Sequence, residues 1–221
     1  LKSVLNDADV ESALSNKRFP WLSAKTIEIG MCPINAIRVA YTGELGWELH
    51  HPIEMQNYLW DRLLLAGSNY GLKLVGARAQ NWLRQEKSYR AFGTELGRDA
   101  TPLEADLSRF IDSEKEFFGK YKMEATGVRA KCITVLINGP SDADPWGREA
   151  LYLEDGTKVG RLTSGGYSVV FGKSIGMGYI RPDLAQEGQK LKVKMFNSFW
   201  DAEVTCDSPY DPKNETIRKD G

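Results

Sequence analysis

Between residues 34 and 50, apolar and polar side chains alternate on both sides of a glycine-rich turn. Residues 34–41 alternate as a half-buried strand does. Residues 42–46 include two glycines, which adopt backbone angles that other residues avoid, and residues 47–50 begin a second strand. The pattern predicts a β-hairpin over residues 34–50.

Helical patterns lie on both sides of this hairpin. Residues 7–15 predict a short helix, followed by a turn at Pro20. Pro52 suits the start of a second helix, because the N–H that it lacks would have no partner there. This helix should end near Gly67. Its apolar face comprises Ile53, Leu59, Trp60, Leu63 and Leu64.

A further helix is predicted over residues 76–88, with Leu83 facing inward. Arg84, Glu86 and Lys87 are then available for pairing at the surface. A contact between Arg84 and Glu86 would stabilise the helix by only a few tenths of a kcal/mol. Strand, turn and strand followed by helices indicate an α+β layer.

The pattern changes at about residue 128, where short strand-like runs alternate with Gly, Pro and Asp. Asp155-Gly156 between two runs is a strong hairpin signal. The predicted strands are 132–137, 150–153, 159–163, 174–180, 190–195 and 200–205. They indicate a small antiparallel barrel or sandwich. We therefore expect an α+β fold with two domains, over residues 1–125 and 126–221.

Charge and composition exclude several classes of function. The 29 Lys and Arg nearly balance the 30 Asp and Glu, so neither nucleic acid nor a membrane surface is an expected partner. No apolar run approaches the roughly 20 residues of a membrane helix. The three Cys are far apart and the two His are adjacent, so no metal site is expected.

Two segments could carry ligand chemistry. Residues 172–174, Gly-Lys-Ser, resemble the end of a phosphate-binding loop, but Tyr167 stands where the first glycine is needed, and 164–166 fit better as turn residues. Tyr41 and Glu48 flank the hairpin turn. A carboxylate there could accept two N–H bonds from a flat heterocycle on which Tyr41 stacks. Spacing alone favours the alternative, a core Tyr and an exposed Glu at the rim.

The residues 41–49, YTGELGWEL, resemble the Y-x-G-E-x-G-x-E signature of the glycine cleavage T-protein (aminomethyltransferase) superfamily, which binds tetrahydrofolate. Further matches follow at 83–87, 101–105, 118–120, 160–166 and 176–180. The resemblance covers nearly the whole chain. It implies the second lobe of the T-protein-like folate-binding fold, followed by a small antiparallel β-barrel.

Residues 86–96, EKSYRAFGTEL, resemble a segment of dimethylglycine and sarcosine dehydrogenases, as do Trp47 and residues 144–147. In those flavoproteins an N-terminal FAD half oxidises an N-methyl amine. A folate half then captures the one-carbon unit. The absence of an Ala-Arg-Asp triplet at residues 79–81 agrees with this branch.

By the same resemblance, Tyr41 packs on the pterin and Glu48 accepts hydrogen bonds from its N–H edge. The main chain at Leu49 and His50 adds polar contacts. Arg109 either meets the carboxylate tail of folate or has a surface role.

The resemblance assigns no catalytic residue to this chain, because the family's acidic residue lies upstream of Leu1. The chain opens without Met, and we interpret it as a piece of a longer polypeptide whose missing N-terminal part is its partner. Alone it should be inactive. The alternatives are a stand-alone aminomethyltransferase, another folate-dependent demethylase and a non-catalytic folate-binding protein. The expected compartment is the bacterial cytoplasm or the mitochondrial matrix.

Overall fold

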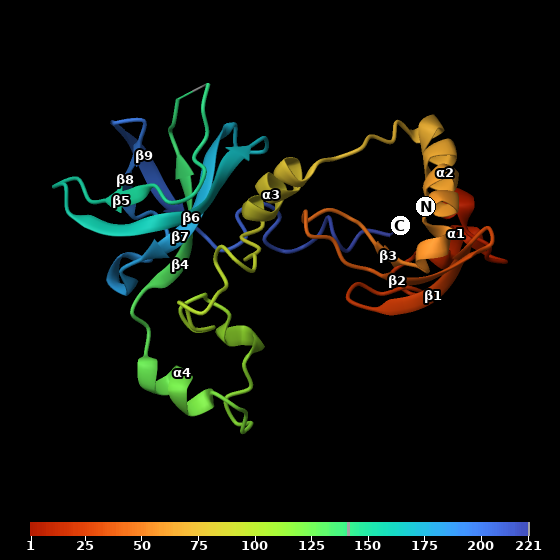
Figure 1. Cartoon of the computed structure of the whole chain (residues 1–221), viewed down its shortest axis with the longest axis horizontal. Coiled ribbons are helices and arrows are strands. Elements are labelled where there is room, and N and C mark those ends of the chain that lie inside the picture. The colour runs from red at the N-terminus through yellow and green to blue at the C-terminus, as the bar shows by residue number, and fades with distance from the viewer. Residues whose placement is uncertain (141, 221) are drawn as a thin grey trace. The chain divides into compact units, whose positions relative to one another are not determined.

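The computed structural model describes residues 1–140 and 142–220, and the chain divides into two compact units (Figure 1). The first comprises Leu1–Gln80 with the C-terminal segment from Lys213, and the second comprises Asn81–Pro212. The two units are defined by how compactly their residues pack together, and not by the sequence motifs. The boundary near residue 126 between a folate-binding lobe and a barrel domain stays a prediction.

The first unit contains a three-stranded antiparallel sheet of β1 (Ala24–Ile29), β2 (Cys32–Ile37) and β3 (Glu48–His50), in that order. Ile37 pairs with Glu48 and Asn35 with His50, which confirms the predicted hairpin. Strand β2 ends at Ile37 rather than at residue 41. The next residue, Arg38, is fully buried and donates hydrogen bonds to the carbonyl oxygens of Phe19 and Leu14.

Helices cover the apolar face of this sheet. The predicted helix from Pro52 to Gly67 is confirmed as η2 (Ile53–Met55) and α2 (Gln56–Gly67), and it buries Leu59 against the sheet residues Ile29 and Ile34. The helix expected over residues 7–15 is only the single turn α1 (Val10–Ala13), and the Asp9 side chain caps its start by accepting a hydrogen bond from the Ser12 N–H. Short 3-10 turns form η1 (Lys2–Val4) and η3 (Ser68–Tyr70).

Helix α3 (Ala77–Glu86) confirms the third predicted helix, but the expected surface role of its charged residues is wrong. Arg84, Glu86 and the following Lys87 are buried, whereas Leu83 is only partly buried. These charged side chains are buried because polar groups of the barrel pack against the end of this helix. Ser168 donates a hydrogen bond of 2.5 Å to Glu86.

Six strands of the described residues close an antiparallel barrel in the second unit, in the order β4-β7-β6-β5-β8-β9. Their bounds are β4 Lys131–Ile137, β5 Ala150–Tyr152, β6 Lys158–Ser168, β7 Lys173–Ile180, β8 Lys190–Met195 and β9 Ser198–Thr205. All six predicted runs are therefore strands. Of the two architectures expected from the sequence, a barrel or a sandwich, the structure has the barrel. Its interior holds Val135, Leu151, Leu162 and Val193.

Strand β6 runs five residues beyond its predicted end at residue 163, so the interpretation of residues 164–166 as turn residues is wrong. Gly165 and Gly166 continue the ladder to β7. A side chain at Gly165 would overlap the backbone of Pro145, and one at Gly166 would overlap Trp82. These glycines therefore permit close packing within a strand. The remaining elements are η4 (Ser108–Phe110), α4 (Lys120–Thr126) and η5 (Pro182–Leu184).

Candidate functional site

The hairpin of the first unit carries four of the five residues expected to bind folate. Glu48 and His50 lie on the polar face of the sheet, because successive strand residues point to opposite sides. Their side chains are 56% and 57% exposed, and His50 Nε2 lies 3.2 Å from Glu48 Oε2. Between them, Leu49 turns the other way and packs against the apolar core.

Tyr41 lies at the start of the turn that precedes β3 and is 37% exposed. Glycine suits two positions of this tight turn. Gly43 has a φ of +79°, and a Cβ at Gly46 would lie only 3.0 Å from the Cβ of Ala40. The ring of Tyr41 and the carboxylate of Glu48 thus lie at the two ends of one compact loop.

A hollow of about 320 Å³ opens on the polar face beside His50. Its lining residues are Thr26, Pro33, Ile34 and Asn35 from the neighbouring strands, with His50, His51 and Pro52. The Thr26 hydroxyl donates a hydrogen bond of 3.2 Å to the Asn35 amide oxygen. Hydroxyl, amide and imidazole groups around one hollow can hydrogen-bond the edge of a polar heterocycle.

The fifth expected residue, Arg109, lies in the second unit, at the centre of η4. It is exposed, and its Nη1 lies 3.3 Å from a carboxylate oxygen of Asp207. Its guanidinium also lies 4.8 Å from the centre of the Phe110 ring. The structure therefore gives Arg109 a surface ion pair, while the other four residues share one hairpin.

A buried ionic cluster in the second unit was missed by the sequence patterns. Arg84 Nη1 lies 2.8 Å from Glu95 Oε2, and the two side chains are 1% and 0% exposed. Glu95 also accepts hydrogen bonds from the hydroxyls of Thr163 and Ser164, at 2.7 and 2.6 Å. Burial by itself would raise the pKa of Glu95, but Arg84 and these hydroxyls outweigh it and hold the pKa below its usual value.

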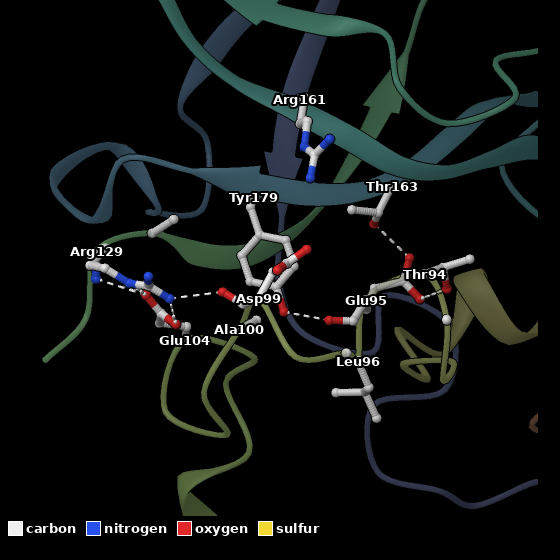
Figure 2. A pocket seen from close by; sticks show the side chains of 13 residues that line it. Thr94, Glu95, Leu96, Asp99, Ala100, Glu104, Arg129, Arg161, Thr163 and Tyr179 are labelled. Carbon is white, nitrogen blue, oxygen red and sulfur yellow. Dashed lines mark hydrogen bonds and ion pairs between the residues drawn. The ribbon is translucent and has the colours of Figure 1, made fainter. Parts of the chain in front are cut away.

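Glu95 borders a hollow of about 360 Å³ between the segment after α3 and the outer face of the barrel (Figure 2). Arg161 and Tyr179 are paired across β6 and β7 on the barrel side. The Tyr179 hydroxyl donates a 2.7 Å hydrogen bond to the Glu95 carbonyl oxygen, and burial raises its pKa, so it stays protonated at neutral pH. Tyr179 thus fixes the main chain at Glu95.

A second ion pair forms the opposite wall of this hollow (Figure 2). Glu104 is buried and receives hydrogen bonds from Arg129 Nε and Nη2, at 2.8 and 2.9 Å. These bonds lower the pKa of Glu104 to about 2. The pattern of apolar residues gave no signal for this pair, because its members are 25 residues apart in the chain.

The described residues lack two kinds of feature. No group of three or more His, Cys, Asp or Glu side chains there is arranged to hold a metal ion. Among the same residues, no helix combines the length and the apolar character needed to cross a membrane.

Two family models match the chain. The model of the GCVT N-terminal domain matches residues 2–115, and the model of the glycine cleavage T-protein C-terminal barrel domain matches residues 131–211. The two matches cover the α+β part and the barrel in the expected order. The chain therefore belongs to the glycine cleavage T-protein family.

Relatives of the chain include enzymes of two kinds. Mitochondrial dimethylglycine dehydrogenase of Mus musculus is 36% identical over 217 residues, which cover 94% of this chain and 24% of that protein. Mitochondrial sarcosine dehydrogenase of the same species is 30% identical, over 98% of this chain and 24% of that protein. The aminomethyltransferase of Desulfitobacterium hafniense is 34% identical, over 81% of this chain and 49% of that protein.

Among solved structures, the glycine cleavage system aminomethyltransferase T of Bartonella henselae superposes with a TM-score of 0.74 at 23% identity, over 85% of this chain and 52% of that one. This match confirms the expected T-protein-like fold. The chain spans about a quarter of the length of the dehydrogenases and about half that of the aminomethyltransferases.

Proposed function

We propose that the chain is the tetrahydrofolate-binding part of a one-carbon-transfer enzyme. Its parent would be an FAD-dependent dimethylglycine or sarcosine dehydrogenase-type flavoprotein, which oxidises an N-methyl amine and passes the one-carbon unit to tetrahydrofolate. The similarity to dimethylglycine dehydrogenase over 94% of the chain supports this parent. FAD would be held by the other half of the polypeptide.

The placement of Glu48 carries the proposal. Its carboxylate stands on an exposed polar face, with only the imidazole of His50 as an ion-pair partner among the described residues. The carboxylate can therefore accept the paired N–H groups of a pterin. A group of that size fits the adjoining hollow, which offers polar groups of Thr26, Asn35 and the two histidines beside the apolar side chains of Pro33, Ile34 and Pro52. The residues present thus fit the cofactor.

The other roles follow from position. Tyr41, at the far end of the loop, would pack its ring on the pterin, and the main chain at Leu49 and His50 would add polar contacts. Arg109 would meet the carboxylate tail of folate in place of its ion pair with Asp207. The acid that assists transfer would come from the preceding part of the polypeptide, so this chain alone would bind without catalysing.

The test compares tetrahydrofolate binding by the longest native polypeptide carrying this sequence with binding by its Glu48→Gln variant, using calorimetry. We expect the dissociation constant to rise by about 10–100-fold, which corresponds to the roughly 1–3 kcal/mol for losing a buried polar contact. Amine oxidation should persist, because its chemistry belongs to the flavin half.

Glu54→Gln is the matched control, since Glu54 is exposed just beyond β3. An unchanged dissociation constant for Glu48→Gln, or an equal loss for Glu54→Gln, would refute the role of Glu48. Loss of amine oxidation with intact folate binding would refute the whole assignment.

A stand-alone aminomethyltransferase is the second candidate, favoured by the 34% identity to the Desulfitobacterium enzyme. The mass and visible spectrum of the native protein distinguish the two. A long yellow chain identifies a flavoprotein, whereas a colourless chain less than twice this length identifies a transferase. If the native protein binds folate but transfers no one-carbon unit, whichever its length and colour, it is a non-catalytic folate-binding protein. A flavoprotein parent would reside in the mitochondrial matrix or the bacterial cytoplasm.

A further inference from the structure

A second hollow of about 480 Å³ lies in the barrel-containing unit, beside the one in Figure 2, and Arg129 and Ala100 line both. Its charged lining residues are Arg98, Lys122 and Arg129, with no carboxylate among the lining. Thr101 and Thr126 add hydroxyl groups. Three cations thus converge from three separate segments of the chain.

Two of these cations are uncompensated. Arg98 and Lys122 are exposed, and within the part of the chain that the structure describes neither side chain has an ion-pair or hydrogen-bond partner. Such long cationic side chains ordinarily project away from one another into water. Here both border one concave surface, where their fields add and attract an anion.

Arg129 differs because Glu104 neutralises it and holds it in place. Its Nε and Nη2 bind Glu104, and Nη2 also donates to the Asp99 carbonyl oxygen at 2.8 Å. Among the described residues, Nη1 makes no hydrogen bond. Arg129 therefore offers a fixed donor, already ordered by its neighbours, so a ligand would not have to order this side chain on binding.

We propose that this hollow binds a phosphate group. The two uncompensated charges of Arg98 and Lys122 match the charge of about −1.5 to −2 on a phosphate or phosphate monoester at neutral pH. A carboxylate carries only one. Arg98, Lys122 and Arg129 Nη1 line one hollow and supply several N–H donors, which suits the outer oxygens of a phosphate. The hollow is larger than phosphate alone, so a phosphate ester of a small molecule fits it as well.

The experiment measures binding to the full chain by calorimetry at constant ionic strength, because salt screens surface charges. The probes are inorganic phosphate, glycerol phosphate and glutarate. We expect both phosphates to bind, and glutarate, a dianion of different shape, to bind more weakly. Tighter binding of glycerol phosphate than of inorganic phosphate would identify an ester as the ligand, and the reverse would identify the free ion.

The variant Arg98→Gln/Lys122→Gln should weaken phosphate binding by about tenfold per residue, the size of one lost charge-assisted hydrogen bond. Lys158→Gln is the control, since Lys158 is an exposed cation on β6 outside both hollows. An undiminished affinity in the double variant, an equal loss in the control, or glutarate binding as tight as phosphate would overturn the proposal. All three sites are exposed, and thermal unfolding checks that the variants fold.

This proposal is independent of the folate proposal. Glu48 and Tyr41 belong to the first unit, and the phosphate-binding residues belong to the second. Failure of one binding experiment therefore leaves the other interpretable.

Discussion

The guanidinium of Arg84 lies 2.8 Å from the carboxylate of Glu95, and water reaches neither side chain. Arg84 lies in the last turn of helix α3, whereas Glu95 lies in the segment that follows the helix. Arg84 also donates a 2.6 Å hydrogen bond to the Ser164 hydroxyl on β6. The pair therefore joins the helix and the following segment to the barrel.

Glu95→Gln should lower the free energy of unfolding by about 3–5 kcal/mol, because it leaves the buried charge of Arg84 uncompensated. Denaturant unfolding of both proteins measures the difference. The comparison variant is Asp183→Asn, which removes an ion pair with Arg181 whose members are both more than half exposed. That change should cost no more than about 1 kcal/mol. Similar losses for the two variants would contradict a special role for the buried pair.

Glu104 should control stability in acid. Its pKa in the folded protein is about 2, below its usual 4.5, chiefly because of the hydrogen bonds from Arg129. The folded state therefore favours the carboxylate, so this contribution is complete above about pH 4.5 and disappears as the pH falls towards 2.

Glu104→Gln tests this dependence through unfolding free energies measured from pH 7 to pH 2. The variant should be less stable than the wild type at neutral pH, and the two curves should approach each other as the pH falls from about 4.5 to about 2. A constant difference across the whole range would show that the carboxylate charge has no part in stability.

Tyr41 should contribute to folate affinity through its ring. Tyr41→Leu should raise the dissociation constant for tetrahydrofolate by about 2–10-fold, since an aromatic pair is worth roughly 0.5–1.5 kcal/mol beyond the area it buries. Tyr41→Phe keeps the ring and should bind nearly as tightly as the wild type. If Phe and Leu weaken binding equally, the hydroxyl and not the stacking is responsible.

Gly178 should be intolerant of a side chain. A Cβ there would overlap the backbone of Arg161 and Leu162 on the paired strand β6. Gly178→Ala should therefore destabilise the chain by about 1–3 kcal/mol, as measured by thermal unfolding. Gly97→Ala is the control, because a Cβ at Gly97 would meet nothing within 4 Å. It should change stability by less than about 0.5 kcal/mol.

Part of the candidate site followed from the sequence because its residues are close along the chain. Tyr41 and Glu48 are joined by one turn, so the motif alone placed them on one hairpin. Glu95, Glu104 and Arg129 gave no such signal. A charged residue normally indicates the surface, and these residues are accommodated by partners that distant segments supply.

The sequence by itself determined where the local elements lie. Short strand-like runs separated by Gly, Pro and Asp marked the barrel strands. Asp155-Gly156 marked a hairpin, and Gly156 has the expected positive φ of 82°. These features depend on neighbouring residues and the backbone angles they allow.

Only the tertiary structure decided which strands meet and which charges are buried. Closure of the barrel pairs Thr134 with Thr205, far apart in the chain. The extension of β6 through Gly165 rests on its pairing with Gly176 of β7, and the burial of Arg84 depends on Glu95 and Ser164. The physical reason is that burying a charge or closing a sheet is favourable only once the remote partner is in place, and no local pattern carries that information.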